Sequence, residues 1–457
     1  MKRKLLSCIL TAVFCLGAAA CTRAEVTEPD NVGGLPLRDT LEAEGYQVSW
    51  NGEDKTIVAF KDGERLVFKP GSAEVSVNGN PITMSSALIL KEGVSYLPEN
   101  ALISLGITDY DGSLAYRINA QMDFNSNYVF SPFSLKAALA MTANGAQGAG
   151  REEIVRGLGY TDLDSLNEDM KALIDRYNGD GEAEMSVADS VWVNEIYPEF
   201  SESFKTALNE YYSAEVQKTS VADYTEKTNK WIKEKSRGLQ DIYLEADANF
   251  VMSLINTTYL KADWVNKFDA NADYDDTFLN ADGSEGSITY MQNTLNTGVY
   301  TDEDVTMVRL DYKDENRDLS FYAAMADPLT DLEAYVSKLE DTRVNLSLPK
   351  FKWHSTITMN DIVKGLGITS IFNENADLGN IFAEDGFDLY VSDILQDTLI
   401  DVNEEGTEAA STTVVIVEET AVLEPPLEIK FNKPFTYFIM DNDSGEILFM
   451  GRLANAE

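Results

Sequence analysis

The chain has 457 residues, of which 44% are hydrophobic and 10% aromatic, so it is long enough to bury a large globular core. Its formal net charge of −41 at pH 7 argues against nucleic acid and against anionic membrane surfaces as binding partners. The acidic residues are scattered along the chain, which is typical of solvated protein faces.

The first 20 residues have the pattern of a targeting segment. A basic start, Lys2–Lys4, precedes an apolar stretch, Leu5–Leu16, that is short for a permanent membrane span. Ala18–Ala20 then precedes Cys21, an arrangement that resembles a bacterial lipobox, although Ala18 stands where leucine is usual. We expect residues 1–20 to be a signal peptide and Cys21 to carry lipid, which would be the protein's only membrane contact. Plain secretion without a lipid is the alternative.

Cysteine usage fits export. All three cysteines, Cys8, Cys15 and Cys21, lie in this leading segment. The mature body would then contain no disulfide and no cysteine metal site. We expect no metal and no cofactor, an extracellular location at the outer face of a bacterial membrane, and a monomer.

Short alternating strands follow. Residues 21–37 are predicted to be a linker, and residues 38–108 carry strand-like runs separated by turn signals at Asn51-Gly52, Asp62-Gly63 and Asn78-Gly79. This succession of hairpins resembles the N-terminal domain first described in copper amine oxidases. The resemblance implies a stalk or binding module without copper chemistry, because the segment contains no histidine or cysteine.

From residue 109 to 457 the pattern mixes helix and strand. Phe204–Tyr211 and Thr225–Gly238 are predicted to be amphipathic surface helices. Other distinctive runs are Asn127–Leu135, Asn229–Ile232, Leu254–Trp264, Leu348–Phe351, Leu366–Ile368, Ala376–Leu378, Val391–Asn403, Ile429–Phe435 and Ile447–Arg452.

The segment Glu404–Val417 is the most informative part of the chain. Small residues come first and a β-branched run follows, with no proline. In a strand, one face would carry only small or apolar uncharged side chains, from Thr407 and Ala409 to Val417. This pattern suits a strand that inserts between existing strands, although an ordinary core strand would show it too.

Together and in this order, these runs resemble the serpins. The resemblance implies an α+β fold with three β-sheets, eight to nine helices and an exposed reactive-centre loop. It also implies a suicide inhibitor: a protease cleaves the loop, forms an acyl-enzyme, and is trapped when the loop inserts into the main sheet. The reactive-centre loop hinge would consist of Glu404, Glu405, Gly406, Thr407, Glu408, Ala409 and Ala410.

The hinge composition favours an inhibitor over a non-inhibitory member of the family. Gly406 supplies a position without Cβ, Thr407 leads the insertion without charge, and Ala409 and Ala410 keep the leading end thin. The resemblance places the shutter, a polar cluster beneath the opening strands, at Ser131, Ser134, Asn256 and Gln396, and the breach near Trp264, facing Glu404. Gln396 stands where many serpins have histidine.

The scissile bond is expected within Thr420, Ala421, Val422 and Leu423, because counts from Gly406, from Phe435 and from Pro425-Pro426 give different positions. None of these residues is Arg or Lys, so elastase-like or subtilisin-like serine proteases fit better than trypsin-like ones. The same residues admit papain-like cysteine proteases. Glu418 and Glu419 admit a glutamate-preferring protease.

Two other classes remain open. One is a hydrolase, although a Ser-His-Asp triad would have to use His354, the only histidine, and no Gly-x-Ser-x-Gly elbow is present. A carboxylate-pair glycosidase is also conceivable among 77 acidic residues. The other class is a non-inhibitory surface binding or adhesion lipoprotein that uses the front domain and keeps the serpin body as a scaffold.

Overall fold

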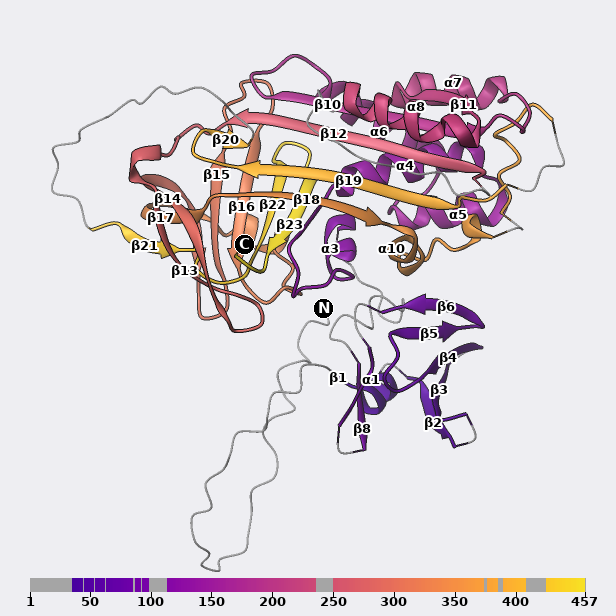
Figure 1. The fold of residues 1–457 in the computed structure, drawn as a ribbon, viewed down its shortest axis with the longest axis horizontal. Helices are drawn as coiled ribbons and strands as arrows, with labels where there is room; N and C mark the ends of the chain where they lie inside the picture. Colours follow the sequence, from indigo (N-terminus) through magenta and orange to yellow (C-terminus); the bar gives the residue numbers. More distant parts are fainter. Residues whose placement is uncertain are drawn as a thin grey trace, which may run out of the picture. The chain divides into compact units, whose positions relative to one another are not determined.

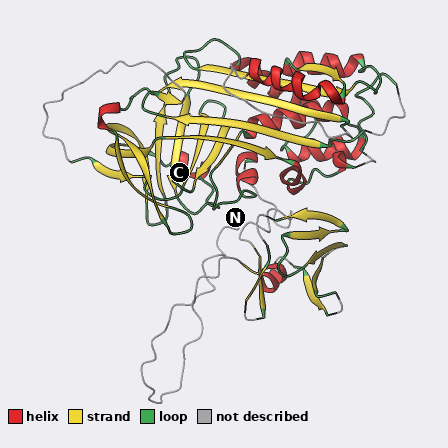
Figure 2. Ribbon diagram, viewed as in Figure 1, coloured by secondary structure: helices red, strands yellow, loops and turns green. Residues whose placement is uncertain are grey.

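The protein is described from a computed structural model (Figures 1 and 2). The structure describes residues 35–43, 45–52, 54–61, 63–84, 87–91, 93–97, 113–235, 250–373, 376–384, 389–407 and 425–456. Within these ranges, no helix has both the length and the hydropathy needed to cross a bilayer.

The front domain consists of two small antiparallel sheets and one helix. One sheet has the order β1-β8-β7 and the other runs β2-β3-β4-β5-β6. The elements are β1 (Leu35–Pro36), α1 (Leu37–Ala43), β2 (Gln47–Asn51), β3 (Thr56–Lys61), β4 (Glu64–Phe68), β5 (Glu74–Val77), β6 (Asn80–Thr83), β7 (Ile89–Lys91) and β8 (Val94–Leu97). The hairpins predicted here are therefore present.

Two details of this domain differ from the sequence prediction. The end of the expected linker lies in β1 and in the first turn of α1, because Leu37 and Leu41, one helical turn apart, are both buried in the domain core. Asn78 and Gly79 both have positive φ, as a tight hairpin turn requires. Between β2 and β3 the positive φ falls at Lys55 instead, so Asn51-Gly52 begins a longer loop.

The serpin-like body is built on two large sheets. The first has six strands in the order β11-β10-β12-β20-β19-β18. These are β11 (Glu215–Thr219), β10 (Glu184–Asn194), β12 (Met252–Asp263), β20 (Gly406–Thr407), β19 (Asp393–Val402) and β18 (Phe351–Thr358).

The second sheet has nine strands and contains the other two sheets expected from the resemblance. It runs β21-β17-β14-β15-β16-β22-β23-β9, with β13 also pairing β14. The strands are β9 (Tyr128–Phe130), β13 (Tyr274–Leu279), β14 (Glu285–Thr301), β15 (Thr306–Asp311), β16 (Leu319–Met325), β17 (Glu340–Pro349), β21 (Leu427–Lys430), β22 (Phe435–Asp441) and β23 (Glu446–Leu453). Strand β14 joins the two expected sheets into one. It pairs with β13 and β17 along most of its length and with β15 only at its end.

Most helices of the body gather at one end, at the right in Figure 2. The body's helices are α3 (Leu114–Asn119), α4 (Pro132–Gly145), α5 (Gly148–Gly157), α6 (Leu163–Tyr177), α7 (Glu202–Tyr212), α8 (Val221–Lys235), α9 (Glu333–Val336), α10 (Asn360–Gly365) and two short 3₁₀ turns, η1 (Ala270–Ala272) and η2 (Ser370–Phe372). α7 and α8 are the two predicted amphipathic helices. Ser201 caps α7 through its hydroxyl, which explains why this helix starts before Phe204.

Candidate functional site: the hinge and the opening of the six-stranded sheet

The hinge segment enters the six-stranded sheet at one end. β20 lies between β12 and β19, where Thr407 pairs with both Ala262 and Val402 and Gly406 pairs with Asp263 (Figure 1). The hydroxyl of Thr407 meets that of Tyr312, and the side chain is buried. The hinge therefore already occupies the first strand positions between β12 and β19.

Beyond β20 the two flanking strands separate. β12 and β19 pair with each other directly only at their first residues, Ser253–Asn256 with Asp393–Gln396. Between this pairing and β20, residues 257–261 of β12 face residues 397–401 of β19, and the described chain forms no ladder between them. We call this stretch the gap.

Gly406 occupies a position that admits no side chain. A Cβ there would lie 1.9 Å from the carbonyl oxygen of Ala262 and 2.9 Å from the Cα of Asp263. Both atoms belong to the backbone of β12, so neither can move aside without shifting the strand. Close backbone approach is thus the physical reason for the glycine.

Trp264 holds the chain just before β20. Its backbone N–H donates to the carbonyl oxygen of Glu405 at 2.8 Å, and its indole N–H donates to that of Asn403 at 2.9 Å. The indole stacks on the ring of Tyr312, with centroids 4.5 Å apart and planes 14° apart. Burial raises the pKa of Tyr312 well above its usual range, so its hydroxyl stays neutral and can donate to Thr407.

Ion pairs flank the same turn. Glu404 accepts from Lys350 at 2.6 Å, and Lys267 contacts both Asp263, at 2.7 Å, and Glu405, at 2.6 Å. Asp273 adds a second carboxyl beside Glu404. Burial and the neighbouring Glu404 raise the pKa of Asp273, whereas hydrogen bonds with Asp273 and Lys350 outweigh burial and lower the pKa of Glu404. Protonation is therefore favoured at Asp273 and ionisation at Glu404.

The shutter residues lie together at the closed end of the gap. Ser131 caps α4 and accepts from the backbone N–H of Ser134. The side chain of Gln396 accepts from the N–H of Ser131 at 2.9 Å and donates to its carbonyl oxygen at 2.7 Å. Because an amide can both donate and accept, Gln396 satisfies both backbone groups without a titratable ring.

A second chain of contacts leads from α4 to the neighbouring strand. The hydroxyl of Ser134 meets that of Thr258, which donates at 3.3 Å to the side-chain oxygen of Asn256. The Asn256 amide nitrogen in turn donates to Asp189 of β10. The predicted residues Ser131, Ser134, Asn256 and Gln396 thus surround the point where β12 and β19 part.

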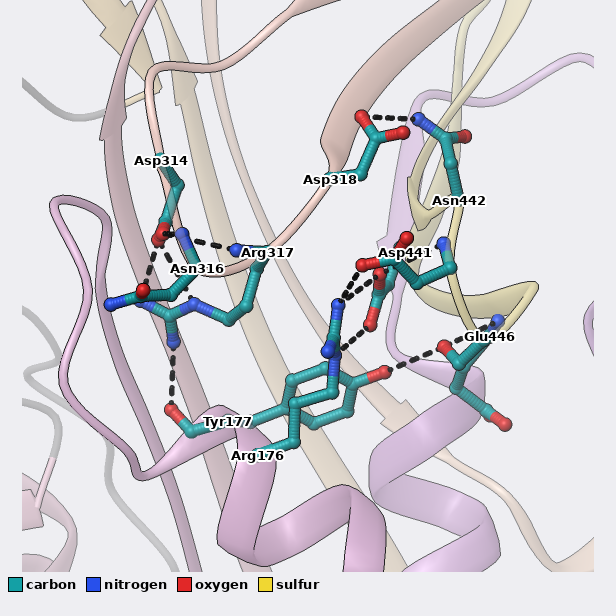
Figure 3. Close-up of polar contacts among 11 residues, drawn as sticks. Arg176, Tyr177, Asp314, Asn316, Arg317, Asp318, Asp441, Asn442 and Glu446 are labelled. Carbon is teal, nitrogen blue, oxygen red and sulfur yellow. Dashed lines mark hydrogen bonds and ion pairs between the residues drawn. The ribbon is translucent and has the colours of Figure 1, made fainter.

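A polar cluster holds the start of β10 to the nine-stranded sheet (Figure 3). The guanidinium of Arg317 binds Asp314 and donates to the backbone oxygens of Tyr177 and Ala183, on either side of the α6–β10 connection. Arg176, at the end of α6, binds Asp441 of β22 through two hydrogen bonds. These bonds anchor β10, the neighbour of β12 on the side away from the gap.

Among the described residues, the contacts of His354 are not those of a hydrolytic triad. Its Nε2 lies 2.8 Å from Asp397 on the neighbouring strand, and Thr356 donates to the same carboxylate at 2.6 Å. Asp397 therefore sits between the histidine and the hydroxyl, whereas a triad needs the histidine between the acid and the nucleophile. Within the described residues, no group of three or more His, Cys, Asp or Glu side chains is arranged to hold a metal ion.

Several predicted site residues lie outside the described residues. They are Cys21, Glu408, Ala409, Ala410, Thr420, Ala421, Val422 and Leu423. Conversely, sequence reasoning missed Asp189, Tyr312 and Asp273, which the fold brings to the site. Lys350 lies in the distinctive run Leu348–Phe351, but the sequence of this run does not predict a role for the lysine.

Comparison with protein families gives two matches. The family model described as Serpin (serine protease inhibitor) matches residues 112–456, and that of the Copper amine oxidase N-terminal domain matches residues 24–108. Serpin-Z10 of Arabidopsis thaliana is 28% identical over 365 residues, covering 74% of this chain and 94% of the relative. Iripin-5 of Ixodes ricinus is 30% identical over 351 residues, covering 72% and 88%.

Solved structures show the same fold. The thermophilic serpin Tengpin in its native state matches with a TM-score of 0.68 at 27% identity, over 75% of this chain and 93% of that one. Arabidopsis AtSerpin1, described as a native stressed conformation, matches with a TM-score of 0.64 at 24% identity, over 78% and 96%. With the family model spanning most of the chain, this protein belongs to the serpin family and carries a copper amine oxidase N-terminal-type domain in front of its serpin domain.

Proposed function

We propose that this protein inhibits serine proteases by inserting its own cleaved reactive-centre loop into the gap. The observation that carries this proposal is the register of β20, in which Thr407 already pairs with both strands that border the gap.

Extending that register gives each following loop residue a place. Ala409 would lie between Leu260 and Ile400, and Ser411 between Thr258 and Thr398. Ile400 and Thr398 are buried, so the uncharged face that begins with Thr407 would turn towards the core. Glu408 would point outward, beside the partly exposed Lys261. The alternation of uncharged and charged side chains at the start of the loop therefore matches the buried and exposed faces of β12 and β19.

Insertion would release free energy in two ways. Each new backbone hydrogen bond contributes about 1 kcal/mol net, and burying each valine of the segment contributes about 1.5 to 3 kcal/mol. A protease attached as an acyl-enzyme to the end of the loop would be carried along the sheet and distorted before water could release it.

We infer the target class from the scissile window. Thr420, Ala421, Val422 and Leu423 are uncharged and small or apolar. Elastase-like and subtilisin-like proteases accept such side chains, and papain-like cysteine proteases are a second group to test.

The test mixes the purified mature protein separately with subtilisin, elastase and trypsin and analyses the products on denaturing gels and by mass spectrometry. We expect an SDS-stable covalent complex with the first two proteases and a released fragment that begins between Ala421 and Glu424. The variant Thr407→Arg, which brings a charge into a buried position, should be cleaved without trapping. Thr294→Arg, at an exposed position of β14, is the matched control and should inhibit normally. Loop cleavage of the unmodified protein with full protease activity retained would reject the proposal.

A surface-binding role of the front domain is the second candidate. This domain contains a pocket of about 490 Å³ lined mainly by apolar side chains, among them Trp50, Leu90 and Val94, which are each about half exposed. Binding through this pocket should survive deletion of the reactive-centre loop and be lost in Trp50→Ala. Inhibition should respond in the opposite way, so the two variants distinguish the two functions.

We also propose that Cys21 anchors the mature protein to the outer face of a bacterial membrane through lipid. The observations that support this are the basic start, the apolar run and Ala18–Ala20 before the cysteine. Labelling with a radioactive fatty acid should mark the unmodified protein and not Cys21→Ser. Absence of label from both would leave plain secretion.

A further inference from the structure

Asp189 of β10 is a buried acid with a partner for only one of its oxygens. Its side chain faces the core beneath the six-stranded sheet and is 2% exposed. Oδ1 accepts a hydrogen bond from the amide of Asn256, whereas Oδ2 is buried and has no hydrogen-bond partner. An ionised carboxylate in such a place loses hydration without full compensation.

The position of this acid relative to the gap is specific. Asp189 pairs in register with Asn256 on β12, and Asn256 pairs with Gln396, the last direct pair before β12 and β19 separate. The hydrogen-bond chain Asp189–Asn256–Thr258–Ser134 therefore passes through the point at which the gap begins.

We propose that the ionisation state of Asp189 controls how readily the six-stranded sheet opens, so that loop insertion in this protein is regulated by pH. The regulation rests on the insertion mechanism proposed above. Neutral Asp189 stabilises the closed arrangement, and ionised Asp189 favours opening at Asn256, because separation of the strands lets water reach the carboxylate.

The electrostatic surroundings agree with this assignment. Burial raises the pKa of Asp189 to about 7, offset only in part by the hydrogen bond from Asn256. Tyr212 of α7 also interacts with it, and burial keeps that phenol neutral. The groups around Tyr212 on α4 and α6 are the amides of Asn144 and Asn167. Among the described residues, no Lys, Arg or His contributes to the pKa of Asp189.

The direction of the pH dependence is set by the difference in the pKa of Asp189 between the closed and opened states. The pKa of Asp189 is higher in the closed state than in an opened, hydrated state, so the closed state loses relative stability as pH rises towards that value. The opening rate should therefore increase with pH, reach half of its maximum near pH 7, and level off above it.

The experiment uses the full-length mature protein and a fluorescein-labelled synthetic peptide with the sequence of Thr407–Glu418, which can occupy the gap as a strand in trans. The rate of peptide incorporation is followed by native gels and fluorescence anisotropy between about pH 5.5 and pH 8.5. We expect roughly tenfold slower incorporation at the acidic end than at the basic end. Infrared absorption should show a buried neutral carboxyl that disappears over the same pH range.

Substitutions at three positions identify the group that titrates. Asp189→Asn keeps the shape and an acceptor for Asn256 and should abolish the pH step and the infrared band; Asp189→Ser serves if the first variant does not fold. Asp393→Asn, an exposed acid on β19 opposite Ser253, should behave like the unmodified protein. Asp273→Asn removes a second acid with a raised pKa, beside Glu404 at the opposite end of the gap.

The outcomes separate the two proposals. A pH-independent rate in the unmodified protein, or a pH step that survives Asp189→Asn but disappears in Asp273→Asn, would overturn the regulation by Asp189 and leave the inhibitor proposal standing. A protein that shows the Asp189-dependent step but never forms a covalent protease complex would support this inference and reject inhibition. Failure to incorporate peptide at any pH would reject the opening that Asp189 is proposed to control.

Discussion

The indole N–H of Trp264 donates a 2.9 Å hydrogen bond to the carbonyl oxygen of Asn403, one residue before the predicted hinge segment begins. Through this bond the residue that follows β12 holds the turn that follows β19. At the end of the gap next to β20, the side chain of Trp264 thereby connects the two strands that border the gap.

Trp264→Phe should weaken this connection. Phenylalanine can keep part of the stacking on Tyr312 but leaves the oxygen of Asn403 without its donor, which costs about 1–3 kcal/mol. We expect faster spontaneous loop insertion and a lower urea midpoint of the native form. Trp353→Phe, at a partly buried site on β18, is the matched control. Equal effects of the two substitutions would show that the hydrogen bond is unimportant.

Gly406→Ala should expel the hinge from the sheet. The added Cβ would overlap the backbone of β12, so β20 cannot form without moving that strand. Hydrogen exchange should accelerate at the amides of Thr407 and its partners. Gly150→Ala in α5 places its Cβ 3.6 Å from Ile371, an ordinary contact, and should leave exchange unchanged. Protected amides in Gly406→Ala would contradict the close approach.

Asp273→Asn should change the pH dependence of native-state stability. Asp273 has a raised pKa, so its contribution is present below the ordinary value for aspartate and lost as pH rises through the raised value. Glu404 has a lowered pKa, so its contribution is present above the ordinary value for glutamate and lost as pH falls. The variant should therefore lose less stability than the unmodified protein between about pH 4 and pH 8. Thermal unfolding at several pH values measures this, and parallel curves would show that Asp273 does not contribute to the pH dependence.

Gln396→His should introduce an acid-sensitive site. A neutral imidazole can accept the N–H of Ser131, but an imidazolium cannot, so the native form should become less stable below about pH 6.5. Gln292→His, on a partly buried position of β14, controls for the added charge. Loss of stability at all pH values would instead indicate a steric effect of the ring.

The sequence predicted much of the hinge because alternation and residue size are local properties. Thr407 faces the core, as its place on the uncharged face implies, and Gly406 lies where backbones approach. The electrostatic interaction of Glu404 with Asp273 and the contact of Thr407 with Tyr312 join residues about a hundred positions apart, and no local pattern marks such pairs. Asp189 was equally hidden, because only the register of β10 on β12 reveals that this acid lies opposite Asn256. The targeting segment and the scissile window stay predictions.

The gap between β12 and β19, in which the described residues form no ladder, also determines what a melting experiment on this protein can measure. If the loop can complete the sheet, the native form is separated from a more stable fold by a barrier, and its apparent unfolding temperature reports the height of that barrier. Heating rate would then shift the transition of the intact protein. The cleaved form, with its sheet complete, should show no such dependence at the same temperatures. Calorimetry alone could therefore distinguish a metastable native form from the most stable fold.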